Sequence, residues 1–139
     1  METAETITAL YRESTAGDEP DGAFLRQLLD ELEDCEDVLF TCGWPDNGEK
    51  WGPIAQLTVT SRRIVEQRTV GAGISAPIRA IALADVIAAI ERGRAELPMF
   101  TTHALVVRLA DGRDVVWEFL TNHQIGPAAE AIASALEGL

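Results

Sequence analysis

The chain has 139 residues, 47% of them hydrophobic, and a formal net charge of −12 at pH 7, which suits one domain with its own hydrophobic core. No apolar run approaches the ~20 residues of a membrane-spanning helix, and the N-terminus shows no secretory leader, so we expect a cytoplasmic protein. Residues 1–37 carry a net charge of −10 and residues 38–139 one of −2, which argues against a nucleic-acid partner because a negative field repels phosphates.

The first part of the chain predicts a flexible or partly helical segment over 1–20 and an amphipathic helix over 22–36. Asp21 is a candidate N-cap, and apolar residues then recur at helical spacing along one stripe, with acids on the other face. The stripe comprises Phe24, Leu25, Leu28, Leu29, Leu32 and Cys35. The acids near the C-terminal end oppose the helix macrodipole, so we expect this helix to be stabilised by packing on a partner surface.

From residue 38 the hydrophobic period changes to two, which indicates strands. The predicted strands are about 38–42, 56–60 and 63–69, two within 78–90 that are broken near Asp85, and 105–109 and 115–119. Asp111-Gly112 predicts the turn of the last hairpin. A final helix, capped by Thr121 or Asn122, has a broad face of small apolar residues. Antiparallel strands closed by one helix, without strand–helix alternation, predict an α+β fold.

Two short patterns resemble bacterial pleckstrin-homology-like (PH-like) domains of the GRAM-like type. Residues 57–65, Leu-Thr-Val-Thr-Ser-Arg-Arg-Ile-Val, resemble a hairpin of that family, and residues 81–86, Ile-Ala-Leu-Ala-Asp-Val, resemble one of its strands. The Asp111-Gly112 hairpin ending in Phe119, and the final helix, follow in the same order. From about residue 37 onward, the resemblance implies a bent antiparallel barrel of about seven strands, capped by the C-terminal helix. Together with the extra N-terminal helix over 22–36, we expect one domain over 21–139. The resemblance also implies a non-catalytic scaffold for lipid headgroups, peptides or proteins, often self-associating.

Residues able to carry out chemistry are few and dispersed. We expect His103 to be a partly buried strand residue, with a base at an open barrel end as the alternative, and His123 to lie in the first turn of the last helix. Cys35 and Cys42 are expected to be reduced thiols, with a bridge or redox pair as the alternative. The spacing of these four side chains is not that of a zinc site. We therefore expect no enzyme activity, no cofactor and no metal.

The remaining polar and aromatic features form a candidate interaction surface. It comprises Trp44, Lys50, Trp51, Arg62, Arg63, Arg68 and Arg79. Exposed indole rings suit a protein interface or a shallow membrane contact, although we expect at least one ring to fold onto the sheet. Three basic residues contribute roughly 3 kcal/mol near an anionic membrane, which the N-terminal acids oppose, so we expect the arginines to pair with the acidic helix in cis or in another subunit.

The predicted function is a non-catalytic interaction module that binds protein, including a second copy of itself. The alternative is a peripheral membrane or lipid-headgroup module that uses the loop between Trp44 and Trp51.

Overall fold

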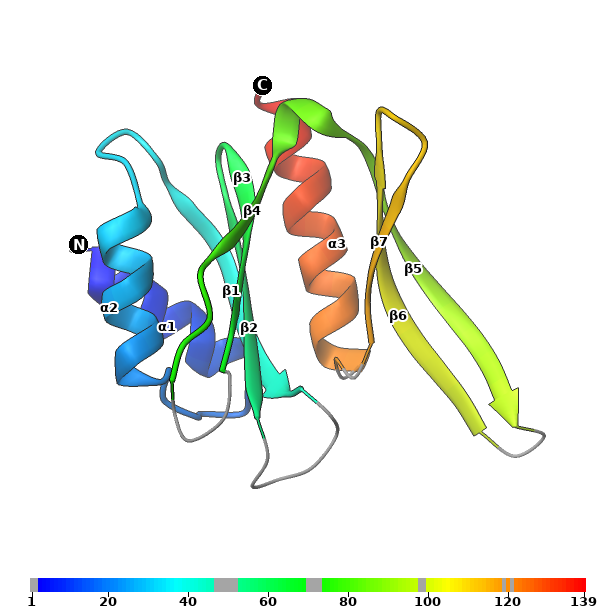
Figure 1. Ribbon diagram of the computed structural model, residues 1–139, viewed down its shortest axis with the longest axis horizontal. Coiled ribbons are helices and arrows are strands. Elements are labelled where there is room, and N and C mark those ends of the chain that lie inside the picture. The colour runs from blue at the N-terminus through cyan, green and yellow to red at the C-terminus, as the bar shows by residue number, and fades with distance from the viewer. Residues whose placement is uncertain (1–2, 47–52, 70–73, 98–99, 119, 121) are drawn as a thin grey trace.

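The computed structural model describes residues 3–46, 53–69, 74–97, 100–118, 120 and 122–139, with side chains left out at 91–103 and 122 (Figure 1). The helices are α1 (Thr3–Ser14), α2 (Gly22–Glu31) and α3 (Asn122–Glu137), with a 3₁₀ turn η1 (Leu83–Asp85). The strands are β1 (Val38–Pro45), β2 (Ile54–Thr60), β3 (Arg63–Arg68), β4 (Arg79–Ala82), β5 (Val86–Leu97), β6 (Phe100–Leu109) and β7 (Asp114–Trp117). The predicted Thr121 cap and Phe119 lie outside the described residues.

The strands form two antiparallel sheets, one ordered β1-β2-β3-β4 and the other β5-β6-β7. Within the described parts of the chain, no strand pairing joins the two sheets into a closed barrel. Figure 1 shows α3 between the sheets, while α1 and α2 lie on the far side of the first sheet. This confirms an α+β fold of seven strands with a C-terminal helix and an N-terminal amphipathic helix. None of the described helices has the length and apolar character needed to span a bilayer.

The main core lies between the two sheets and α3. Its members alternate along the strands, as the period of two predicted, and line the inner faces of both sheets. They include Phe40, Cys42, Trp44, Leu57, Val59, Ile64, Leu105, Val107 and Trp117, with Ile125, Ala128 and Ile132 from α3. Small residues on α3 let the helix approach the sheets closely.

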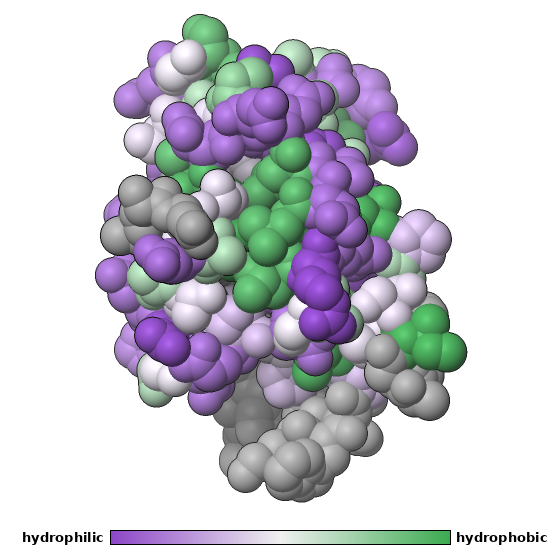
Figure 2. All heavy atoms as spheres, turned by 90° about the vertical axis from the view of Figure 1, so that its left-hand side faces the viewer, coloured by the Kyte–Doolittle hydropathy of each residue, from purple (hydrophilic) through white to green (hydrophobic). Residues whose placement is uncertain are grey.

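The outer face of the first sheet is polar, although α1 and α2 cover it. Thr41 and Thr58 share a hydrogen bond of 2.9 Å between their hydroxyls, and the Gln56 amide donates to Thr41. Gln67 donates to the Phe24 carbonyl of α2 at 2.8 Å. A small apolar cluster of Ile7, Leu28 and Val65 completes this contact, and Figure 2 shows a narrow apolar strip between hydrophilic side chains on the face that bears α1 and α2.

The end of α2 differs from the prediction of a helix over 22–36. Asp21 caps the N-terminus by accepting from the Ala23 and Phe24 amides, as expected, but the helix ends at Glu31 and Leu32 is extended. Acidic residues at 31–36 destabilise a continuing helix through its dipole. Instead, Glu31, Glu33 and Glu36 form ion pairs with Arg62 and Arg63 at the β2–β3 turn.

Candidate functional site

Arg63 binds the acidic segment that follows α2. Its guanidinium donates to both carboxylate oxygens of Glu36 at 2.9 Å, to the Glu31 carboxylate at 2.8 Å and to the Glu31 carbonyl at 2.7 Å. The Glu36 side chain is 0% exposed. Burial raises the pKa of Glu36, but hydrogen bonds from Arg63 and Thr60 outweigh burial and hold it below its ordinary value. The bonds to Glu36 likewise raise the pKa of Arg63.

The other predicted arginines occupy separate places. Arg62 pairs with Glu33 at the surface, where both side chains are more than half exposed. Arg68 pairs with Glu66 at 3.0 Å and with Asp46. Burial and the neighbouring charge of Arg79 lower the pKa of Arg68. The pairing of Arg62 and Arg63 with the acidic segment therefore occurs in cis, and the four arginines do not form one basic patch.

Arg79 lines a polar cleft of about 500 Å³ between β4 and the β6–β7 turn. Asp85, Asp111 and Arg113 lie in the same cleft, and Arg113 donates to Asp111 at 2.6 Å. Two acidic and two basic side chains leave this cleft without a net charge, so it has no preference for a phosphate group.

Trp44 does not present its ring to a partner. It lies on the inner face of β1, 5% exposed, within the main core. Trp44 therefore meets the expectation that at least one indole ring folds onto the sheet. The prediction that Trp44 belongs to the candidate interaction surface is wrong. Lys50 and Trp51 lie outside the described residues.

The histidines and cysteines stay apart. Cys42 is buried in the core, where burial raises the pKa of its thiol, and Cys35 is exposed, each as a free thiol. His123 is exposed in the first turn of α3, as predicted, while the side chain of His103 lies outside the described residues. Among the side chains that are described, no group of three metal-ligating residues comes together.

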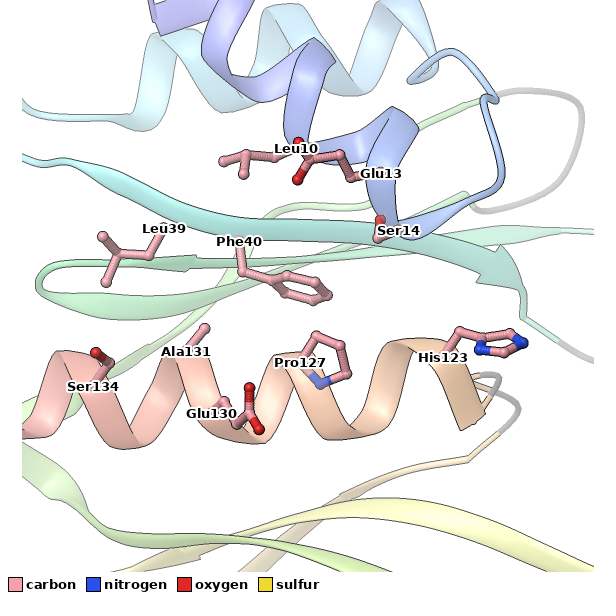
Figure 3. Close-up of a pocket in the computed structure, with 10 residues that line it drawn as sticks. All are labelled: Leu10, Glu13, Ser14, Leu39, Phe40, His123, Pro127, Glu130, Ala131 and Ser134. Carbon is pink, nitrogen blue, oxygen red and sulfur yellow. The ribbon is translucent and has the colours of Figure 1, made fainter.

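A groove of about 570 Å³ separates α1 from α3 and runs along β1 (Figure 3). Leu10, Glu13, Leu39, Phe40, Pro127 and Glu130 are among the residues that line it. Phe40 is 7% exposed and forms part of the core, whereas Leu39 is 38% exposed. The groove thus has an apolar floor and one carboxylate on each helical wall.

β1 is the edge strand of the first sheet, and side chains cover the middle of its free edge. The Ser14 hydroxyl donates to the Thr41 carbonyl at 2.7 Å, and the Gln124 amide donates to the Gly43 carbonyl at 2.9 Å. Pro45 ends the strand and has no N–H to offer. Capped carbonyls and a terminal proline are common protections of an edge strand against pairing with another chain.

The outer face of the second sheet carries an apolar row. Ile90 of β5, Val106 of β6 and Val116 of β7 lie side by side in the strand register. Ile90 and Val116 are 39% and 38% exposed, and they enclose Val106, which is 2% exposed. Arg108 and Asp114 form the next row and pair at 3.1 Å.

Sequence reasoning missed both the groove and this row. The groove depends on the spacing of two helices separated by more than a hundred residues. Val106 and Val116 are apolar where the alternation of each strand would place a polar residue, but the pattern does not reveal which face of the sheet a helix covers.

No protein-family model matches the chain, and no curated protein does. Solved structures do match, among them one described as the hSac2 domain from human phosphoinositide phosphatase Sac2. That domain is 13% identical, with a TM-score of 0.49, over 86% of this chain and 82% of that chain.

Proposed function

We propose that this chain is a non-catalytic interaction module of PH-like type that associates with protein, including a second copy of itself. The arrangement of two antiparallel sheets around a C-terminal helix supports the fold part of this proposal. Residues 57–65 form the β2–β3 hairpin, which agrees with the hairpin that the resemblance implies. Residues 81–86 differ from the single strand that it implies, because they run from β4 through η1 into β5.

The observation that carries the proposal is the apolar row on the second sheet. On the first sheet the outer face is covered by α1 and α2, whereas in Figure 1 no described helix covers the outer face of β5–β7. An apolar row flanked by charges is typical of an interface with another protein. Arg108 and Asp114 carry charges of opposite sign. In a dimer with a two-fold axis, Arg108 of each copy can therefore pair with Asp114 of the other copy.

The test measures the mass of the protein in solution by sedimentation equilibrium over a wide dilution range. We expect concentration-dependent dimers of the wild type and monomers of Val116→Asp. Leu39→Asp is the matched control, because Leu39 is equally exposed at 38% but lies on β1. A wild type that stays monomeric at the highest concentration contradicts the proposal. So does a result in which Leu39→Asp weakens the dimer as much as Val116→Asp does.

The membrane alternative has less support. It relied on two exposed indole rings, and Trp44 lies in the core. Flotation with anionic and neutral vesicles tests it directly: binding only to the anionic vesicles, with a blue shift of tryptophan emission, favours the membrane function over protein association.

A further inference from the structure

The groove between α1 and α3 combines an apolar floor with acceptor groups on its walls. Figure 3 shows Phe40 between the two helices and Pro127 on the side of α3 that faces it, with Glu13 on α1 above and Glu130 lower on α3. Apolar side chains in a groove of about 570 Å³ give room for the aliphatic part of a ligand. They do not by themselves select which ligand binds.

The carboxylates of the groove supply that selection. Neither Glu13 nor Glu130 forms an ion pair or hydrogen bond with another residue in the described part of the chain. Pro127 lacks an N–H, so the His123 carbonyl of α3 loses its usual helical donor. The His123 ring itself points away from Glu130 (Figure 3).

Two donors beside the groove are already engaged, while the polar side chains of His123 and Ser134 also line it. The Ser14 hydroxyl donates to the Thr41 carbonyl, and the Gln124 amide donates to the Gly43 and Ser14 carbonyls. These bonds also cover the middle of the β1 edge, so a ligand here meets side chains and not a free strand edge. The two carboxylates and the apolar floor favour a ligand that donates hydrogen bonds, carries positive charge and has an apolar stem.

We propose that this groove binds a basic segment of a partner protein, with arginine or lysine side chains that lay their methylene groups on Phe40 and Pro127 and pair their charged heads with Glu13 and Glu130. Long basic side chains lay their methylene groups on apolar surface while the head pairs with carboxylates. The net charge of −12 attracts such a segment and speeds its encounter. None of the residues that line the groove belongs to the second sheet, so this proposal does not depend on self-association through the apolar row.

The test uses the full chain and two synthetic peptides, one alternating leucine and arginine and one alternating leucine and glutamate, followed by isothermal titration calorimetry. We expect the arginine peptide to bind, more weakly as salt is raised, and the glutamate peptide not to bind. The double variant Glu13→Gln/Glu130→Gln should bind about tenfold more weakly, the effect of losing two partly exposed ion pairs.

The matched control is Glu5→Gln/Glu137→Gln. It makes the same change of charge on the same two helices, at exposed positions outside the groove, and should bind like the wild type. Ala131→Phe adds bulk at a groove residue without changing charge and should reduce binding as much as the double variant does.

The proposal would be overturned by no binding of the arginine peptide by the wild type, by equal weakening in the control double variant, or by unchanged binding to Ala131→Phe. Loss of self-association in Glu13→Gln/Glu130→Gln would also overturn it, in favour of a second copy as the occupant. Val116→Asp separates the two proposals, because it should abolish dimers and leave peptide binding unchanged.

Discussion

Replacing either of the two adjacent arginines at the β2–β3 turn should have very different effects on stability. Arg63→Met leaves the Glu36 carboxylate, whose side chain is 0% exposed, with only the Thr60 hydroxyl and the Glu33 amide as donors. Removing one partner of a buried ion pair costs about 3–5 kcal/mol. Because Arg63 is itself 18% exposed and water can enter the vacated space, we expect the lower end, about 3 kcal/mol.

Arg62→Met removes the same charge one residue away and should cost about 0.5 kcal/mol or less, because Arg62 and Glu33 are 53% and 62% exposed and surface pairs contribute little. The assay is urea unfolding at neutral pH, followed by tryptophan fluorescence and by circular dichroism. Agreement of the two probes establishes a two-state transition.

A difference of less than about 1 kcal/mol between the two variants would refute this account of how the segment after α2 is held. An m-value that falls only in Arg63→Met would also be informative, since it would show that this segment is released while the core stays folded.

Three further predictions concern single residues. Because the folded-state pKa of Glu36 lies below its ordinary 4.5, its contribution to stability is present above that pH and is lost as the pH falls through the folded pKa; Glu36→Gln should flatten the decline of unfolding free energy in acid. Gly43→Ala places a Cβ against the Tyr11 hydroxyl and should cost about 1–3 kcal/mol by overpacking, as measured by thermal denaturation, with Tyr11→Ala in the same chain relieving the clash. A thiol reagent should modify Cys35 at once and Cys42 only on unfolding, because Cys35 is exposed and Cys42 is buried with a raised pKa; rapid modification of both thiols in the native protein would contradict the packing of β1.

The parts of the fold that could be predicted are those with a local signal. The period of two places Val107 and Trp117 in the core, and Asp111-Gly112 makes the expected hairpin turn, with Gly112 at a φ of +89° that glycine adopts readily. The break near Asp85 is the 3₁₀ turn between β4 and β5. Each of these features depends on neighbouring residues alone, so the sequence pattern is sufficient.

The features that could not be predicted depend on tertiary contacts. The apolar stripe of α2 continues to Cys35 in the sequence, but the helix ends at Glu31, and Arg63 forms ion pairs with Glu31 and Glu36 on either side of this end. Trp44 sits in a loop-like sequence of turn residues, yet β1 extends to Pro45 and turns the ring inward. In both cases a partner distant in the chain outweighs the local pattern, which is the usual limit of intrinsic propensity.

The polar face beneath α1 and α2 explains how the N-terminal region is attached. Sheet faces that are permanently buried are normally apolar, as the inner face with Leu57 and Val59 is. Here the buried outer face consists largely of threonine and glutamine, and the side-chain oxygens of Gln56 and Gln67 have no hydrogen-bond partner within the described structure. Unsatisfied buried oxygens reduce the net stability of a contact, so the small cluster around Ile7, the ion pairs of Arg63 and the hydrogen bond from Gln67 to the Phe24 carbonyl have to hold α1 and α2 in place. Because α1 also supplies Glu13 to the groove, a ligand that bridges Glu13 and α3 would strengthen the same attachment.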